Sequence, residues 1–201
     1  MSLNNNNHQS ILKNINELLD LGVKNRNHSF HTPVFSTYNK NNHINSRIVV
    51  LRKYDNKSLT LCFNTDIRSP KISEIKNNKH SYFLFYDFKL KIQLRIMTTS
   101  IIHNKNKFTT DAWNLTPLQS RKCYLTQKKP SSKTTRAEDA IPKNLIGINP
   151  SNEESQKGYK NFTVIENIIQ NIDWLHLASS GHRRLNINFE KNKPKYDWLI
   201  P

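Results

Sequence analysis

The sequence has few of the residues that build nucleotide loops, disulfide frameworks and metal sites. Four glycines occur in 201 residues, and neither GxGxxG nor GxxxxGK[ST] is present, so a Rossmann or P-loop site is excluded. Cys62 and Cys123 lie far apart and outside any CxxC spacing, which argues against a disulfide framework and a zinc site and fits a reducing compartment. The eight histidines lack metal-ligand spacing such as HExxH, so we expect no metal.

Long apolar runs and catalytic carboxylate pairs are also missing. No stretch approaches the roughly 18 apolar residues needed to span a bilayer, and the start of the chain does not have the pattern of a signal peptide. We therefore expect a soluble, cytoplasmic protein. Only 15 Asp and Glu residues occur, without an evident acid–base pair, and there is no G-x-S-x-G elbow. A bound cofactor that brings its own reactivity is a better hypothesis than catalysis by side chains alone.

Positive charge is in excess, with 31 Lys and Arg residues and a formal net charge of +16. Such an excess of positive charge favours binding to a polyanionic partner. The cations are scattered along the chain without a block of five, which indicates general anion affinity more than a defined nucleic-acid groove. Nucleic-acid binding is kept as an alternative function.

The apolar pattern predicts one domain over residues 1–201 that is mainly β, a barrel with a few helices. A first helix is expected from Ser10 to Gly22 and another over 111–125, interrupted at Pro117. Strands are expected at 32–38, 46–54, 58–65, 80–88, 91–102, 161–167, 172–177, 184–190 and 196–201. The polar stretch 127–160 is longer than an ordinary loop and is predicted to be an insertion, a flexible lid or partly disordered.

The stretch "FNTDIRSPKI", residues 63–72, has the parts of a phosphate site. Ser69 followed by Pro70 predicts the start of a helix over 69–78. Arg68 and Lys71 place cations at this positive end of the helix dipole, which a bound phosphate would make favourable. The alternative is that these cations point into water.

Two further arginines flank the apolar strand "RIVVLR", residues 47–52, which we expect to be enclosed on both sides as in a closed barrel. Either Arg47 and Arg52 extend their charged ends into solvent, or they converge on the same anion. The basic cluster "HRR" at 182–184 is likewise either a solvated turn or part of a site.

Five motifs in order, "RIVVLR", "FNTDIRSPK", "KIQLRI", "DWLHLASSGHRR" and "WLIP", resemble those of the pyridoxamine 5′-phosphate oxidase-like FMN-binding split barrels. The likeness covers about residues 32–201 apart from the insertion. It is greatest to the related group described only as flavin-binding, rather than to the vitamin B6 oxidase. The resemblance implies a split β-barrel that acts as a homodimer, with FMN bound at the subunit interface.

The resemblance also implies roles for individual residues. Arg47 and Lys71 would bind the phosphate, Gln93 the isoalloxazine ring, and Trp174 and Arg184 would reach the flavin from the partner subunit. Arg52 and His182 would lie on the substrate side, and Tyr124, Lys128 and Lys129 only loosely match a substrate-phosphate site. The expected cofactor-binding residues are Arg47, Ile48, Val49, Val50, Leu51, Arg52, Asn64, Thr65, Ser69, Lys71, Gln93, Trp174 and Arg184.

Three positions depart from the oxidase pattern. Arg52 stands where the family has a Lys, Ser180 stands where the oxidase has an arginine over its substrate, and Pro70 replaces a second phosphate-binding arginine. Arg68 is a candidate to compensate for Pro70. We therefore expect an FMN-dependent oxidoreductase that acts on an unknown small substrate. A non-catalytic flavin-binding or sensing module is the alternative.

Overall fold

The computed structural model describes residues 7–201. Its α-helices are α1 (His8–Lys24), α2 (Pro70–Asn77), α3 (Lys107–Asn114), α4 (Leu118–Arg121) and α5 (Asn152–Gln156). Its strands are β1 (Val34–Tyr38), β2 (Ile44–Ile48), β3 (Lys53–Asp55), β4 (Thr60–Asp66), β5 (His80–Asp87), β6 (Ile92–His103), β7 (Phe162–His176), β8 (Arg183–Glu190) and β9 (Lys193–Leu199). Short 3-10 helices lie at Ser29–His31, Lys122–Leu125, Lys143–Leu145 and Tyr159–Asn161.

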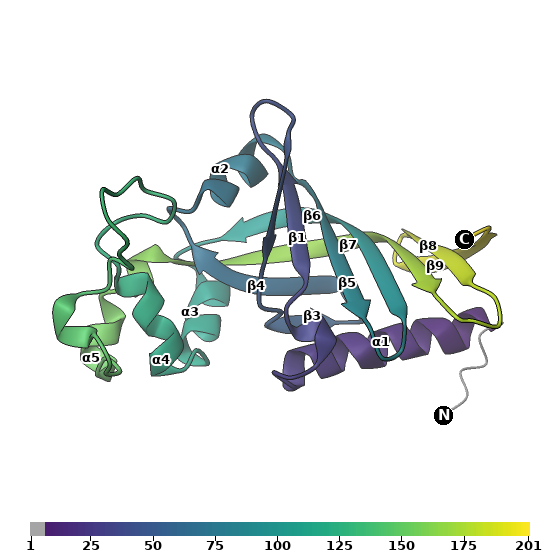
Figure 1. The fold of residues 1–201 in the computed structure, drawn as a ribbon, viewed down its shortest axis with the longest axis horizontal. Coiled ribbons are helices and arrows are strands. Elements are labelled where there is room, and N and C mark those ends of the chain that lie inside the picture. The colour runs from purple at the N-terminus through teal and green to yellow at the C-terminus, as the bar shows by residue number, and fades with distance from the viewer. Residues whose placement is uncertain (1–6) are drawn as a thin grey trace.

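The strands form one antiparallel sheet in the order β2-β1-β5-β6-β7-β4-β3, and β8 and β9 extend it beside β7. The two edge strands β2 and β3 follow each other in the chain, so the link between them joins the two edges. In this link the Val49 N–H donates to the Pro33 carbonyl beside β1, whereas the Arg52 N–H donates to the Cys62 carbonyl on β4. Residues 49–52, here called the closing segment, thus complete a barrel (Figure 1).

Side chains alternate between the two faces along residues 47–52, as they do in any extended strand. Val49 and Leu51 are buried, with 8% and 0% exposure, whereas Ile48 is 61% exposed. The prediction that this strand is enclosed on both sides is therefore wrong for the single chain, in which one face packs inside the barrel and the other faces outward. Arg47 and Arg52 leave the strand on opposite faces and do not converge on one anion.

Helix α1 begins beside β8 and β9 and runs along the lower side of the barrel towards β3 (Figure 1). The predicted apolar face is confirmed, because Ile11, Ile15, Leu18 and Leu19 are all buried in the main core. Each such side chain contributes roughly 1.5–3 kcal/mol on burial. The predicted ends are wrong: the Asn7 side chain caps the start by accepting from the Ser10 N–H, and the helix continues past Gly22 to Lys24.

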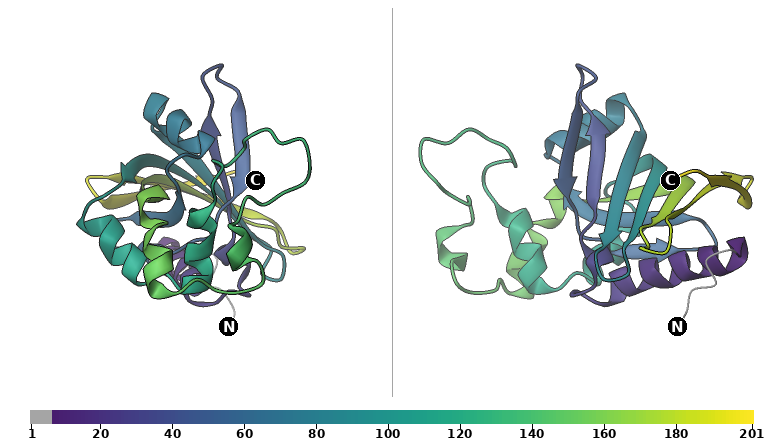
Figure 2. Two further views of the ribbon diagram at one scale, coloured as in Figure 1. Left: turned by 90° about the vertical axis from the view of Figure 1, so that its left-hand side faces the viewer. Right: turned by 45° about the vertical axis from the view of Figure 1, so that its right-hand side comes forward.

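Strand β4 is buried on both faces over its first four residues, Thr60 to Phe63. Its inner face meets the barrel core. Its outer face carries Cys62 into a second cluster, formed with Trp113, Tyr124, Phe162 and Val164. This cluster attaches α3, α4 and the following segment to one side of the barrel (Figure 2).

One other expectation needs correction. The separate strands expected at 161–167 and 172–177 are one continuous strand, β7, which has partners along its whole length. Parts of the stretch 127–160 pack against the rest of the chain: Leu145 and Ser155 are buried, and the Gln156 side chain accepts a hydrogen bond from Trp113 Nε1 at 3.1 Å. The break at Pro117 is confirmed, although α3 begins earlier than expected, at Lys107.

None of the helices within residues 7–201 is long and apolar enough to cross a membrane.

Gly22 is required by close packing rather than by a turn. A Cβ atom built at this position would lie 2.8 Å from the Phe30 carbonyl oxygen and 2.9 Å from the Phe30 Cβ. The Gly22 carbonyl also lies 2.7 Å from the His31 Nδ1 atom. The 28–31 segment thus packs directly on the helix backbone.

We expect Gly22→Ala to destabilise the protein by about 1–3 kcal/mol, because the overpacking cost exceeds the roughly 1 kcal/mol that Ala gains over Gly in a helix. Urea unfolding followed by circular dichroism measures the change. Glu17→Ala, at an exposed position of the same helix, serves as the control and should lie within about 0.5 kcal/mol of the wild type. A Gly22→Ala protein as stable as this control would contradict the packing argument.

Candidate anion site and cavity

Helix α2 begins where the sequence predicts, with Ser69 as the N-cap and Pro70 as the first helical residue. The Ser69 hydroxyl does not cap the helix backbone. Instead it accepts a hydrogen bond from Lys71 Nζ at 2.7 Å, and the Thr65 hydroxyl accepts from the same ammonium at 3.0 Å. Burial, and after it the charge of Arg47, lower the pKa of Lys71.

Arg47 reaches the same region from β2. Its Nη2 donates to Glu74 Oε2 at 2.9 Å and its Nη1 donates to the Thr37 hydroxyl. A guanidinium has five N–H donors, so these two bonds leave three for another acceptor. Arg47, Thr65, Ser69 and Lys71 are here called the cation cluster, since they bring two cations and two hydroxyls together from three elements.

Glu74 joins the two halves of this cluster. Its carboxylate is 5% exposed and accepts from Thr37, from Asn45 Nδ2 at 2.6 Å and from Arg47. Burial alone would raise the pKa of Glu74, but these hydrogen bonds and the charge of Arg47 outweigh it, and the pKa lies below its ordinary value. Glu74 therefore fixes α2 against the β1–β2 hairpin.

Arg68 is not part of the cation cluster. It forms an ion pair with Asp66, with Nη2 at 2.7 Å from Oδ2, and it donates to the carbonyl and hydroxyl oxygens of Thr126. Its guanidinium thus holds the start of the 127–160 stretch to the end of β4. The structure offers no support for Arg68 as a substitute for the basic residue missing at Pro70.

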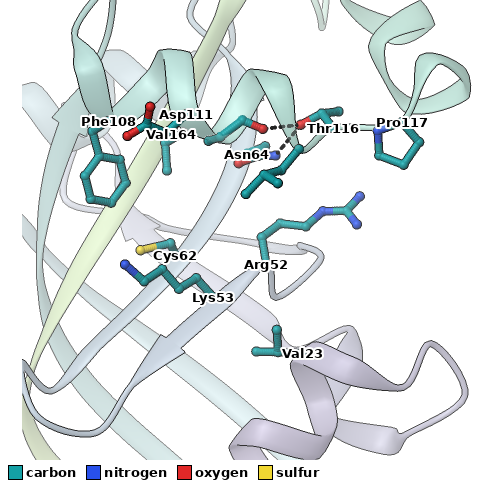
Figure 3. A pocket seen from close by; sticks show the side chains of 12 residues that line it. Val23, Arg52, Lys53, Cys62, Asn64, Phe108, Asp111, Thr116, Pro117 and Val164 are labelled. Carbon is teal, nitrogen blue, oxygen red and sulfur yellow. Dashed lines mark hydrogen bonds between the residues drawn. The ribbon is translucent and has the colours of Figure 1, made fainter.

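A cavity of about 560 Å³ lies between the outer face of β4 and helix α3. Arg52 and Lys53 border it from the barrel side, and Phe108 and Asp111 border it from α3 (Figure 3). Asn64 lines the cavity and donates a 3.5 Å hydrogen bond to the Thr116 hydroxyl. Because Asn64 precedes Thr65 in β4, the cavity and the cation cluster begin at neighbouring residues. No residue of 127–160 lines this cavity.

Gln93 and Arg184 lie on the outer face of the sheet, away from the cation cluster. Gln93 pairs with Leu175, which pairs with Arg184 on the next strand. Arg184 is held by Asp173, with Nη2 at 2.8 Å from Oδ2, and Arg95 binds the same carboxylate. Within one chain, therefore, these two expected flavin-binding residues are together but apart from Arg47 and Lys71.

The structure places Trp174 inside the barrel of its own chain. Trp174 pairs with Leu94 and Leu185, is 0% exposed and belongs to the main core. It points to the inner face of the sheet, whereas Arg184 points to the outer face. The contact of Trp174 with a flavin of the partner subunit, which the resemblance implies, stays a prediction.

The remaining substrate-side residues are not brought together. His182 and Ser180 are exposed in the connection between β7 and β8, and His182 does not line the cavity that contains Arg52. Tyr124 is 7% exposed inside the second cluster, and Lys128 forms an ion pair with Glu138. The loose match of Tyr124 and Lys128 to a substrate-phosphate site is therefore not supported within the chain.

Sequence reasoning missed Glu74, Thr37 and Lys53. Glu74 occurs one turn along a helix whose start was recognised, so its position beside Lys71 could have been found from helical spacing. The contacts of Glu74 with Thr37 and Arg47 could not have been predicted, because they join segments that only the folded barrel brings together. Among residues 7–201, no group of three His, Cys, Asp or Glu side chains could hold a metal ion.

We expect Glu74→Ala to destabilise the protein by about 2 kcal/mol at neutral pH, since hydrogen bonds to a charged group contribute roughly 1.5–3 kcal/mol. The pKa of Glu74 is lower in the folded chain than in the unfolded one, so its contribution is present above the ordinary carboxyl pKa and is lost as the pH falls through the folded value. Urea unfolding between pH 3 and pH 8 tests this.

The control is Asp111→Ala, which removes an exposed ion pair with Lys107 and should cost less than about 1 kcal/mol. A stability difference between wild type and Glu74→Ala that does not shrink on acidification would show that the carboxylate charge contributes nothing.

Comparison with known proteins supports the fold. Residues 12–104 match the family model described as pyridoxamine 5′-phosphate oxidase, FMN-binding domain. No curated protein matches the sequence. A pyridoxamine 5′-phosphate oxidase-related, FMN-binding protein from Nostoc punctiforme superposes with a TM-score of 0.72 at 16% identity, covering 94% of this chain and 96% of its own.

A second similar structure is PhzG from Burkholderia lata, solved in complex with tetrahydrophenazine-1-carboxylic acid. It has a TM-score of 0.71 at 15% identity and covers 96% of this chain and 92% of its own. At such identities these structures show a common fold and no more. The mainly β fold expected from the motifs is confirmed, and the family resemblance is confirmed over residues 12–104, which match the family model; the chain shares the split-barrel fold of these FMN-binding proteins.

Proposed function

We propose that the protein binds FMN and acts as a flavin-dependent oxidoreductase on a small substrate. The observation that carries the proposal is the cation cluster. Arg47 and Lys71 lie close enough for the charge of one to lower the pKa of the other, and Glu74 is the acidic partner of Arg47. Two cations against one carboxylate leave a net positive charge at the start of α2, which suits the 5′-phosphate of a flavin nucleotide.

The residues present fit this cofactor. Arg47 retains three N–H donors, and Lys71 is already oriented by the Thr65 and Ser69 hydroxyls, so little side-chain freedom would be lost on binding a phosphate. The outward-facing side chains of Ile48 and Val50 follow Arg47 along the strand and would lie beside the rest of the nucleotide, with Asn64 near the ring.

FMN would supply the redox chemistry, since a flavin accepts and returns a hydride or single electrons. The chain would supply binding, orientation and electrostatics. Arg47 and Lys71 would hold the phosphate, and Arg52 at the mouth of the cavity would orient a substrate. No side chain of the cavity has the arrangement of a dedicated nucleophile.

We also infer that the site is completed by a second copy of the chain. Gln93 and Arg184 share an outer face of the sheet with exposed apolar side chains, among them Ile48, Leu84 and Tyr86. Apolar side chains gathered on one sheet face favour a protein interface. A homodimer through this face would bring Gln93 and Arg184, with His182, towards the other copy's cation cluster.

A non-catalytic flavin-binding or sensing module is the second candidate. It is favoured by the state of the acidic groups among the described residues that line the cavity: Asp111 already pairs with Lys107, and burial raises the pKa of the Cys62 thiol to about 12. Turnover of electron donors and acceptors no faster than with free FMN would favour this module over the enzyme.

Titration of the protein with FMN, followed by flavin fluorescence, tests the phosphate site. We expect Arg47→Ala and Lys71→Ala each to weaken FMN binding at least about tenfold, because each removes a charge-assisted hydrogen bond worth roughly 1.5–3 kcal/mol. Riboflavin, which lacks the phosphate, should bind both variants and the wild type about equally.

Lys76→Ala is the matched control, since Lys76 is an exposed cation in the last turn of the same helix. Its FMN affinity should change less than about twofold. Thermal unfolding of each variant shows whether the fold is retained. The proposal is contradicted if the wild-type protein takes up no FMN, or if the Arg47→Ala and Lys71→Ala variants bind FMN as the wild type does.

The Leu84→Lys variant tests the inferred homodimer. A charge in the centre of the apolar face should dissociate the homodimer, and it should weaken FMN binding because Gln93 and Arg184 are removed from the site. Light scattering coupled to size exclusion measures the mass. Lys76→Ala should remain dimeric, and a wild-type protein that is monomeric at micromolar concentration would contradict the inference.

A further inference from the structure

The proposed phosphate site of the flavin uses only two of the 31 Lys and Arg residues. We propose that three of the others form a second binding site, which holds a single strand of nucleic acid through its phosphates. This site is an open hollow of about 650 Å³ between α3 and the turn after α5. The lysine hollow, as we call it here, is lined by Lys105, Thr110, Gln156, Lys157, Tyr159 and Lys160. Strand binding there does not depend on flavin binding.

The lysine hollow has three cations and no carboxylate in its wall. Within residues 7–201, the three lysines of the hollow form no ion pair. Other cations of the same part of the chain are already bonded, since Lys107 pairs with Asp111 and Lys128 pairs with Glu138. The hollow therefore carries three positive charges that the protein itself does not neutralise, and such a concave basic surface attracts a polyanion.

Close packing holds the turn that carries Lys157 and Lys160. Gly158 lies between them and is buried, and a Cβ atom built there would lie 3.2 Å from the Tyr124 Cβ. The Asn161 side chain, next to Lys160, donates a hydrogen bond to the Tyr124 carbonyl at 2.8 Å. The two lysines thus extend from a backbone that is fixed against the body of the protein.

Lys105 reaches the hollow from a second segment, the turn between β6 and α3. Its backbone is in the left-handed region, with a φ of 52°. The residues on either side hold this turn: the Asn104 side chain donates to the Phe162 carbonyl at 3.0 Å, and the Asn106 side chain caps α3 by accepting from the Thr109 N–H. Lysines that are scattered in the sequence are therefore brought together by the fold.

Gln156 and Tyr159 add a donor and an aromatic ring to the wall. Gln156 Oε1 accepts from Trp113 Nε1 at 3.1 Å, so the amide NH2 is the end of this side chain that stays open for an acceptor. The Tyr159 hydroxyl lies 2.8 Å from that of Thr110, and its half-buried ring packs at 5.7 Å from the Trp113 ring. N–H donors suit phosphate oxygens, and an aromatic ring is a surface on which a base can stack.

The basic surface continues beyond the lysine hollow, which favours a chain of phosphates over a single one. Lys157 and Lys160 also line a second hollow of about 350 Å³, together with Arg68 and one acidic residue, Glu154. A single strand can follow both hollows with its backbone and still turn a base towards Tyr159. A duplex keeps its bases paired inside, so it would leave that ring without a base to stack on.

Fluorescence anisotropy with a short, labelled oligothymidylate tests the proposal. Three phosphate contacts on a single strand give a log–log salt slope of about −2, so the affinity should fall about 20-fold between about 50 and 200 mM salt. The triple variant Lys105→Gln, Lys157→Gln, Lys160→Gln should bind at least about tenfold more weakly at the lower salt concentration. It should also lose most of the salt dependence.

The matched control is the triple variant Lys191→Gln, Lys193→Gln, Lys195→Gln. These three lysines are exposed, lie in and next to β9 at the other end of the molecule, and lower the net charge by the same amount when replaced (Figure 1). The control should bind the oligothymidylate within about twofold of the wild type. Thermal unfolding shows whether each variant retains the fold.

The proposal is overturned if the oligothymidylate does not bind, or if the control loses as much affinity as the lysine-hollow variant, since net charge alone would then explain the binding. It is also overturned if a duplex of equal length binds as tightly as the single strand. The same holds if inorganic tripolyphosphate competes, phosphate for phosphate, as well as unlabelled oligothymidylate does, because the ligand would then not be a nucleic acid.

Uptake of FMN by the lysine-hollow variant should equal that of the wild type, because Arg47 and Lys71 are unchanged. Loss of strand binding with FMN binding retained would show that the two sites are separate. If the protein takes up no FMN but binds the strand as expected, the flavin proposal fails and the lysine hollow remains.

Discussion

The closing segment, residues 49–52, fixes the geometry on which both functional regions depend. It carries the chain from the β1 edge of the sheet to the β4 edge, and its backbone hydrogen bonds attach it to both. Side chains alternate along residues 47–52, so Val49 and Leu51 pack inside the barrel, and the side chains of Arg47, in β2, and Arg52, at the end of the closing segment, leave the strand on opposite faces. One arginine therefore serves the cation cluster and the other serves the cavity.

Neutral and acidic neighbours hold the charged groups of the cation cluster in positions that suit an anion. Glu74 holds Arg47, and two hydroxyls hold Lys71, so the charged groups keep fixed positions while part of their donor capacity stays open. If each cation had its own acidic partner, the positive charge of the cluster would be cancelled. If neither had one, Arg47 and Lys71 would repel each other. A single buried carboxylate between α2 and the β1–β2 hairpin meets both needs and explains why the site can be stable before a phosphate arrives.

Local signals in the sequence were enough to find α2 and most strands. Ser69 and Pro70 placed the start of α2 correctly, and the strand expected at 91–102 corresponds to β6 (Ile92–His103). The sequence did not reveal that β7 is continuous, because polar residues near Asn171 resemble a break until partner strands on both sides are known.

The burial of Trp174 inside the barrel could not be read from the motifs. Motif spacing paired it with Arg184, ten residues later, but a turn separates the two, and the pairing of β7 with β8 sets their faces independently. Long-range contacts also hid Glu74, whose partners lie 27 to 37 residues away in the chain. Residues that contact neighbours through helix or strand spacing could be predicted, whereas those that join distant segments could not.

The central claim is that the start of α2 and Arg47 together bind the phosphate of FMN. A crystal structure of the protein grown with FMN tests it most directly. The account predicts the 5′-phosphate within hydrogen-bonding distance of Arg47 and Lys71, with the ring extending along the outward face of the closing segment towards Asn64. A flavin whose phosphate lies elsewhere, with Arg47 still bound only to Glu74 and Thr37, would contradict it.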